Sequence, residues 1–434
     1  MNFSRRDFLK TSAGLTLLGA LPQLAAALPP PNEKIQKVRE VALSVLKPSQ
    51  KDLEHGLELH ANSLVFESYG FAPRAAVDGD AFRTAIEAGA SDTELADLRE
   101  EMTMTRWATN AAERKEFLEA FRAAGVTCIF QNAGEEGNDP LRLMKRLARF
   151  TFATDLIRDE MFKAVKPDDI VAAKKQNKLC LYFTGNGVPL RQEWNSVRDE
   201  LGYIRIFHQL GIRMMHLTYN RRNPLGDGCG EPNDGGLSDF GRAAIEEMNR
   251  VGVIVDVAHS GWRTSLEAAK ASKKPMVASH TTAASLYKHF RGKPDEVIRA
   301  ICDTGGLVGV CCIPRFLGGA GDIGVFLNHI EHIVRTFGAD HAAIGMDVAY
   351  TSRNEEAERK KIPKRTDGRS SAVRWEHLWP ADSGKSASHA EASLAWTNWP
   401  LFTVGMVQRG IKEHDIRKIL GENVLRVARA NFAR

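Results

Sequence analysis

The sequence predicts a closed (β/α)8 barrel of the TIM type. Eight apolar runs of strand length follow one another, and the intervals between them are long enough for helices. Polar residues that could bind metal or move protons fall at the carboxyl ends of these runs, which is where a barrel keeps its active site. A doubly wound parallel sheet is the alternative arrangement for the same alternation.

The eight expected strands are short, mostly apolar runs. They cover residues 56–60, 125–132, 178–185, 212–219, 253–259, 275–280, 306–313 and 341–348. Residues 239–251 and 326–337 repeat apolar side chains every three or four positions, as amphipathic helices do. A similar pattern over residues 415–430 predicts a last helix, which we expect on the outside of the barrel.

Two long segments interrupt this alternation over the carboxyl ends of the strands. Residues 72–122 predict a helical, charged insertion after the first strand, and residues 349–395 predict a long loop after the eighth. Loops in these places often close over a substrate, although a solvated loop has the same composition.

The first residues form a targeting signal rather than part of the fold. Arg5 and Arg6 precede a weakly apolar run rich in alanine, as in a twin-arginine export signal. Pro22, Gln23 and the short apolar length argue against a stable membrane span. We therefore expect an export signal at 1–28, a linker at 29–50 and a single catalytic domain at 51–434, located in the periplasm or secreted.

Composition excludes some classes of protein. The net charge is +5, and the lysines and arginines are scattered among acidic residues, so the chain shows no basic patch for nucleic acid. The six cysteines form no CxxC pair, and four of them lie in apolar runs, as small buried residues do. We expect free thiols.

The most informative stretch is 251–291, which reads as one strand–helix–strand unit. Its two strands end on His259 and His280. Because neighbouring parallel strands finish at one edge of the sheet, the two imidazoles should converge there. Two histidines that merely cap core strands would give the same pattern. The other strand ends add His60, Tyr219 and Asp347.

Several stretches resemble the renal or membrane dipeptidase family of zinc-dependent barrel hydrolases. They are residues 210–228, 236–261, 274–301, 341–347 and 409–427, in matching order and spacing. The resemblance implies that His259 and His280 bind metal, that Arg291 receives a substrate carboxylate, and that Asp347 receives the substrate amino group.

Three positions depart from the family pattern, each toward less negative charge. The family's Asp-Gly-His-Asn-Asp motif aligns with residues 58–62, where His60 survives as a metal ligand and Asn62 replaces an aspartate. Thr184 is the nearest match to a glutamate that bridges two metals. Tyr219 replaces a histidine that helps to polarise the scissile carbonyl.

These departures favour one zinc ion over two. Two dications need anionic ligands to offset their repulsion, and neutral imidazoles cannot supply that charge. We expect one ion on His259 and His280, with His60 or Asp347 completing its shell.

The sequence therefore predicts an exported, metal-dependent hydrolase that cleaves an amide bond in a small, dipeptide-like substrate. Asp347 would act as base or amine acceptor, Tyr219 would donate to the oxyanion, and Arg291 would bind the terminal carboxylate. Two alternatives stay open: a single-metal barrel enzyme acting on another carboxylate-bearing metabolite, and a non-catalytic paralogue that binds a ligand. Whether the chain forms a homodimer is also open.

Export should depend on the arginine pair. Replacing Arg5 and Arg6 together by lysine should leave folded precursor in the cytoplasm, because a twin-arginine signal is read through both guanidinium groups. Cell fractionation checks this, and processed protein outside the cytoplasm would contradict it.

Overall fold

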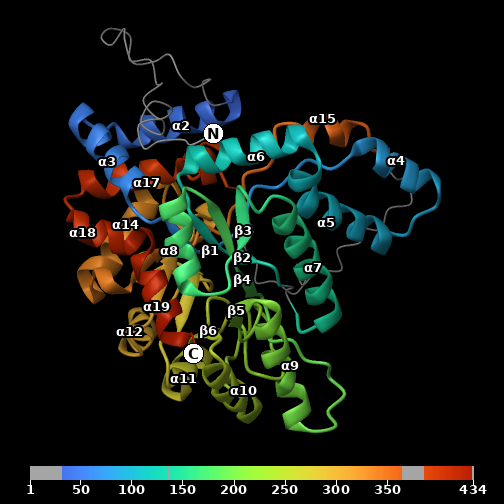
Figure 1. The fold of residues 1–434 in the computed structure, drawn as a ribbon. Helices are drawn as coiled ribbons and strands as arrows, with labels where there is room; N and C mark the ends of the chain where they lie inside the picture. The colour runs from blue at the N-terminus through green and yellow to red at the C-terminus, as the bar shows by residue number, and fades with distance from the viewer. Residues whose placement is uncertain (1–31, 135–136, 364–385, 433–434) are drawn as a thin grey trace.

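The computed structural model describes residues 32–134, 137–363 and 386–432. Eight parallel strands follow one another around a nearly closed barrel in the order β1, β2, β4, β5, β6, β7, β8 and β9, while β3 pairs with β4 beside it (Figure 1). The predicted (β/α)8 barrel is confirmed. The strands are β1 (Phe66–Gly70), β2 (Cys128–Asn132), β3 (Met161–Lys163), β4 (Leu179–Gly185), β5 (Ile212–His216), β6 (Ile254–Asp256), β7 (Val277–Thr281), β8 (Leu307–Val310) and β9 (Ala342–Ile344).

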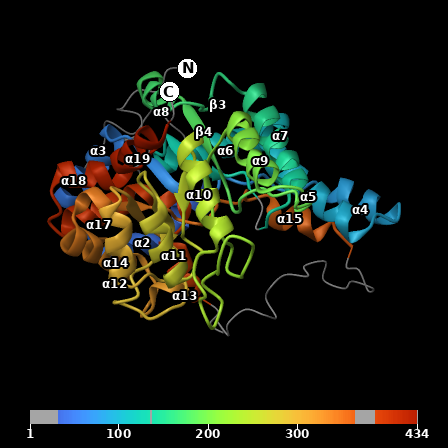
Figure 2. The ribbon, with the colours of Figure 1, turned by 90° about the horizontal axis from the view of Figure 1, so that it is seen from below.

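Helices surround the barrel, as the view in Figure 2 shows. Those between β1 and β5 are α4 (Gly79–Glu87), α5 (Asp92–Thr109), α6 (Ala111–Ala124), α7 (Pro140–Leu156), α8 (Pro167–Gln176) and α9 (Val197–Leu210). Those between β5 and β9 are α10 (Asp239–Val251), α11 (Trp262–Ala271), α12 (Asp295–Asp303), α13 (Pro314–Leu317), α14 (Ile323–Phe337) and the short η1 (Ala339–His341).

The remaining helices come from the two ends of the described chain and from the segment after β9. They are α2 (Glu33–Leu46), α3 (Gln50–Asn62), α15 (Glu355–Lys360), α16 (Ser388–Ser393), η3 (Trp396–Asn398), α17 (Trp399–Gln408), α18 (Glu413–Arg417), η4 (Lys418–Glu422) and α19 (Asn423–Asn431).

Seven of the eight expected strands overlap an observed one, and the first prediction is wrong. Residues 56–60 lie inside helix α3, which begins after the N-cap Ser49, whose side chain accepts from the Asp52 amide. Gly56 lets this helix pack closely on α17, because a Cβ there would lie 2.6 Å from Val404 Cα. The first barrel strand is the next apolar run, β1.

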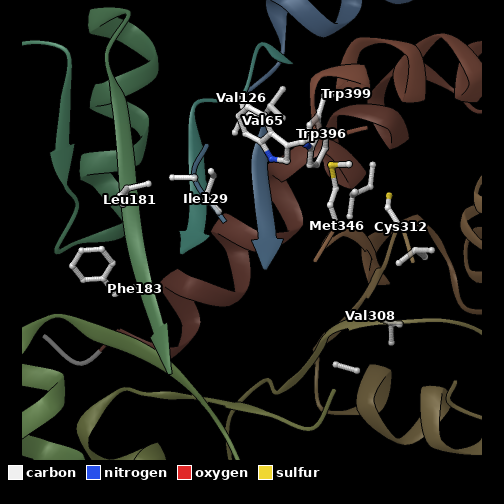
Figure 3. Packing of buried hydrophobic residues seen from close by; sticks show 14 of the residues in the cluster. Val65, Val126, Ile129, Leu181, Phe183, Val308, Cys312, Met346, Trp396 and Trp399 are labelled. Atoms are coloured by element: carbon white, nitrogen blue, oxygen red, sulfur yellow. The ribbon is translucent and has the colours of Figure 1, made fainter. Parts of the chain in front are cut away.

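Side chains alternate between the interior of the barrel and the layer beneath the helices. Phe66, Phe130 and Tyr182 point inward and contact one another, with ring centroids 5.0–6.2 Å apart. Ile129 and Leu181, one position along from inward-facing residues, belong to the outer apolar layer (Figure 3). This alternation fixes which strand residues can reach a central site.

The last helix closes the barrel instead of covering its outside, contrary to expectation. Val424 and Val427 of α19 join the interior cluster and line the same small cavity as Phe130, Met214 and Ile254. The helix contacts β1, β6, β8 and β9, which lie on different sides of the barrel. Helix α19 therefore closes one end of the barrel, and an active site can form only at the opposite end.

The insertion expected at residues 72–122 is confirmed as helices α4, α5 and α6. Helix α15, from the segment after β9, lies beside α4 although far from it in sequence (Figure 1). Part of the loop expected at 349–395 lies outside the described residues. Residues 33–46, assigned to a linker by the sequence analysis, form helix α2, whose Ile35 and Ala42 are buried.

The buried carboxylate of Glu67 on β1 connects the two ends of the strand path. Its Oε1 accepts from the Met346 amide, just beyond β9, at 3.2 Å, and its Oε2 accepts from Trp396 Nε1 at 2.9 Å. Trp396 and Trp399 lie beside Val65 and Val126, where the chain enters β1 and β2 (Figure 3). Burial raises the pKa of Glu67 well above its usual range.

No helix in the described ranges combines the length and the apolar character that a membrane crossing requires.

Replacing Glu67 by leucine should destabilise the barrel, since it leaves the Met346 and Trp396 N–H groups buried without acceptors. Each such group costs about 1–3 kcal/mol. Chemical denaturation should therefore show a lower free energy of unfolding for Glu67→Leu. The loss should shrink when Trp396→Phe is already present, and strictly additive effects would contradict the shared hydrogen bond.

Candidate active site

A cluster of buried polar side chains gathers at the carboxyl ends of β5, β6 and β7. His216 is the last residue of β5 and is paired in register with Asp256, the last residue of β6. His280 lies within β7, and His259 follows β6 after two residues. The exposed fraction is 5% for His259 and zero for the other three side chains. The fold therefore brings three imidazoles and a carboxylate together at one edge.

The histidines form two close contacts. His216 Nε2 lies 2.7 Å from Asp256 Oδ2, and His259 Nε2 lies 2.8 Å from His280 Nε2. His259 Nδ1 faces Asn220 Oδ1 at 2.7 Å. Because an amide oxygen can only accept, His259 carries its proton on Nδ1, which leaves a lone pair on Nε2.

Three of these side chains form a group that could hold a metal ion. One ligand atom each from His216, Asp256 and His280 can be chosen so that all three lie within 4.8 Å of one another. Both ring nitrogens of His216 and Asp256 Oδ2 have no directed hydrogen bond, although they are buried. Asp256 Oδ1, in contrast, accepts from the amides of Ala258 and Ser279 at 2.9 and 3.1 Å. Two imidazoles and a carboxylate, aimed at one place, are a donor set that suits zinc and similar ions.

Burial and nearby charges favour neutral imidazoles at His259 and His280 and an ionised Asp256. Burial, reinforced by the Arg291 cation, holds the pKa of His259 and His280 well below the usual range. Burial alone would raise the pKa of Asp256, but the His216 imidazole and hydrogen bonds from Ser279 bring it below its usual value. These are the protonation states that metal ligands need.

Arg291 lies next to the histidines and is almost fully buried, with 1% of its surface exposed. Its guanidinium donates to the carbonyl oxygens of Ala258 and His280, and its NH2 group lies 3.3 Å from His259 Nε2. It thus fastens the segment after β6 to β7. Its expected contact with a substrate carboxylate stays a prediction.

Lys293 makes a second buried connection. Its Nζ donates to the Ser260 carbonyl oxygen and, at 3.1 Å, to Ser265 Oγ, and burial lowers its pKa to about 8.

Two tyrosines stack on the cluster, Tyr69 from β1 and Tyr219 from the segment that follows β5. The Tyr219 ring lies 4.3 Å from that of His259, and the Tyr69 ring of β1 lies 3.8 Å from that of His280. The Tyr69 hydroxyl donates to Asn186 Oδ1 at 2.8 Å, which fixes its ring.

Asp347 follows β9 in the left-handed backbone region, with φ of 59°. Burial raises its pKa to about 6, and the nearby cation of Arg291 opposes that rise. Asp347, Tyr219 and His259 together line one cavity of about 380 Å³, a volume suited to a small molecule. A carboxyl with this pKa can exchange a proton near neutral pH.

His60 is far from this site in the fold and is not brought to it. It lies on α3, where its Nδ1 is 2.8 Å from Thr403 Oγ1 and its Nε2 is 2.9 Å from the Ala124 carbonyl oxygen. The expected metal-ligand role depended on a strand at residues 56–60, and that strand is a helix. Asn62 ends the same helix.

Thr184 lies on the strand where it was expected, in β4. Its hydroxyl donates to the Met214 carbonyl oxygen at 3.1 Å.

His216, Asp256 and Tyr69 belong to the site but are not predicted from the sequence. His216 and Asp256 lie inside apolar runs that continue to Tyr219 and His259, beyond the ends of β5 and β6. An isolated histidine or aspartate in a buried run is itself a signal, because a buried titratable group needs a partner. Tyr69 was hidden by the misplaced first strand.

Comparison with known proteins gives the family and the export route. Residues 81–358 match the membrane dipeptidase family, peptidase family M19. Residues 2–22 match the twin-arginine translocation signal sequence, so the chain carries a signal for export to the periplasm or beyond. The dipeptidase tcpJ of Claviceps purpurea (strain 20.1) is 28% identical over 280 residues, which is 63% of this chain. The chain spans only 56% of the length of that relative.

Solved structures repeat the fold. An amidohydrolase from Pseudomonas aeruginosa is 26% identical, with a TM-score of 0.63 over 87% of this chain and 99% of its own. A metallo peptidase from Rhodobacter sphaeroides, liganded with a phosphinate mimic of the dipeptide L-Ala-D-Ala, has a TM-score of 0.60 over 86% of this chain and 100% of its own. At 16% identity, that second likeness shows the fold alone. Because the family match covers more than half of the sequence, the chain belongs to the membrane dipeptidase family, whose members are metal-dependent hydrolases.

Proposed function

We propose that this chain is an exported hydrolase that uses one metal ion to cleave an amide bond in a small, dipeptide-like substrate. The observation that carries the proposal is the convergence of His216, Asp256 and His280 next to His259, which lines the same cavity as Asp347. Membership of the membrane dipeptidase family supports the reaction class.

The residues present fit a single ion better than a pair. The group His216, Asp256 and His280 supplies one negative charge, and His259 Nε2 offers a further neutral donor next to His280. Two dications would need more anionic ligands than this cluster contains. This set replaces the one expected from the sequence, in which His60 or Asp347 joined His259 and His280.

When bound, a zinc ion in this place would polarise a carbonyl group and lower the pKa of a water molecule. The protein's own groups prepare the site for that chemistry. Arg291 and Lys293 hold the segments that carry the histidines, and Asn220 sets the tautomer of His259. Asp347, with a pKa near 6, would take a proton or bind the substrate amine. Tyr219, on the wall of the cavity, would donate its hydroxyl to the developing oxyanion.

Hydrolysis of dipeptides should follow the ionisation of Asp347. Because a base acts only when deprotonated, kcat/KM should rise as the pH increases through about 6. Asp347→Asn should remove this limb and lower kcat/KM by about 10²–10⁴-fold. A dipeptide panel assayed with metal-replete protein checks both. If no dipeptide is cleaved, the chain acts on another carboxylate-bearing metabolite or only binds a ligand.

Metal content should depend on the three converging side chains. Elemental analysis of protein purified without chelator should give at most one transition-metal ion per chain. His216→Ala and Asp256→Asn should each lose it, whereas His55→Ala, an exposed histidine on α3, should keep it. Two ions per chain, or full retention in both site variants with circular dichroism unchanged, would contradict the assignment.

A further inference from the structure

Arginines dominate the part of the cavity that lies outside the barrel. Five arginines line the cavity, against three carboxylates, Glu100, Glu355 and Asp347. The arginines are Arg74, Arg99, Arg142, Arg146 and Arg359. Four of them come from helices α5, α7 and α15, which lie together on one side of the barrel (Figure 1). The candidate reacting groups, His259, Tyr219 and Asp347, come from the barrel itself.

Some of these charges are already balanced within the protein. Arg142 NH2 lies 2.9 Å from Glu100 Oε1, and Arg359 Nε lies 2.5 Å from Glu355 Oε1. The other oxygen of Glu355 accepts from the Val77 amide at 3.1 Å. Each oxygen of Glu355 therefore already has a donor within the protein.

Arg74 and Arg99 lack such partners. In the part of the chain that the structure describes, neither guanidinium has a carboxylate within ion-pair distance. Each instead lies over an aromatic ring, Arg74 at 4.8 Å from the centroid of Phe71 and Arg99 at 4.9 Å from that of Phe82. A ring that supports one face of a guanidinium leaves its N–H edge free to bind an anion.

Arg74 is exposed in the cavity, and Arg99 is half-buried. Loss of contact with water lowers the pKa of both residues, and the neighbouring Arg359 lowers that of Arg99 further, whereas Glu355 partly opposes the fall at each and Asp347 opposes it at Arg74. An anionic ligand would offset both effects and would form charge-assisted hydrogen bonds.

The two arginines occupy different positions relative to the reacting groups. The Arg74 backbone donates to the Tyr350 carbonyl oxygen at 2.8 Å and accepts from the Ser352 amide at 3.0 Å, so it is fastened to the segment that carries Asp347. Arg99, on α5, lies near Arg359 of α15. Arginine side chains therefore line the cavity from Arg74, near Asp347, to Arg99 and Arg359 at the helical insertion.

We propose that Arg74 and Arg99 form an anion subsite, and that the preferred substrate carries an acidic group beyond the bond that is cleaved. This inference rests on the proposed hydrolase function, of which it names the substrate class: dipeptide-like molecules with a carboxylate or phosphate on the side chain. Arg291, whose guanidinium donates to backbone carbonyl oxygens, is not among the residues that line the cavity.

Kinetics with matched substrates test the subsite. Wild-type enzyme should cleave Glu-Ala with kcat/KM about 10–100-fold above Gln-Ala, as charge-assisted hydrogen bonding allows. Phosphoseryl-alanine against seryl-alanine tests phosphate in the same way, and the larger of the two ratios identifies the preferred anion. Arg99→Gln and Arg74→Gln should each reduce the ratio toward one, and Arg99→Lys should retain part of it. Arg83→Gln, an exposed arginine of α4 paired with Asp80, should leave it unchanged.

Equilibrium binding separates failure of the subsite from failure of the hydrolase function. Calorimetry on the full-length, metal-replete Asp347→Asn protein should show Glu-Ala or phosphoseryl-alanine binding at least 10-fold more tightly than its neutral counterpart. That preference should disappear with Arg99→Gln added, whether or not the wild type cleaves any dipeptide. Equal binding of acidic and neutral dipeptides, or a preference that survives both arginine substitutions, would overturn the proposal.

Discussion

The closure of the barrel depends on the side chain of Glu67. The path of hydrogen-bonded strands has β1 at one end and β9 at the other, and these two strands are not paired with each other. Hydrogen-bonded strands lead from β1 round to β9, and Glu67 joins the two ends by accepting from Met346 and from the Trp396 indole. Burial of the Glu67 carboxyl group is tolerated, although it disfavours the charged form, because each of its oxygens accepts a hydrogen bond. Since Met346 precedes Asp347, the same contact fixes the start of the strained turn that presents the candidate base.

Electrostatics then divide the upper part of the barrel into two regions. Around the histidines, burial and then the Arg291 and Lys293 cations suppress protonation of His259 and His280, while the two cations donate to backbone carbonyl oxygens and to Ser265 Oγ. Toward the insertion, arginines face the cavity, and two of them are supported by aromatic rings instead of carboxylates. The first region sets the protonation state of the side chains that could bind a metal ion. The second region sets which charge on a substrate is favoured in the cavity. On the proposal above, the helical insertion selects the substrate while the barrel carries the reacting groups.

Much of the fold can be predicted from the sequence because, along most of the chain, the repeat of apolar residues matches the type of element that forms there. The sequence predicts helix α10 over residues 239–251, as observed, and β4 to within one residue, because buried strands and amphipathic helices have distinct repeats. The prediction of a strand at residues 56–60 is wrong because the segment 50–62 is short and alternates apolar with polar residues irregularly. Its helical repeat is therefore weak, and His60 at its end resembles a metal ligand at the end of a strand. His60 is buried against α17 as part of that repeat.

Less of the site could be foreseen. His259, His280, Tyr219 and Asp347 can be predicted because they lie near the carboxyl ends of strands, but His216 and Asp256 become partners only through the register of β5 and β6. The role of the insertion was also out of reach. Nothing in the local sequence around Arg74 or Arg99 shows that an aromatic ring takes the place of a counter-ion.

The cysteines bear on how the protein survives after export. All six are free and buried, and Cys128 and Cys180 are register partners on adjacent strands inside the barrel. A chain that unfolds in an oxidising compartment exposes six thiols, any two of which can cross-link before the barrel re-forms. Such unfolding would be effectively irreversible. The working lifetime of the exported protein is then set by its rate of unfolding, and the barrier to unfolding matters more than the equilibrium stability.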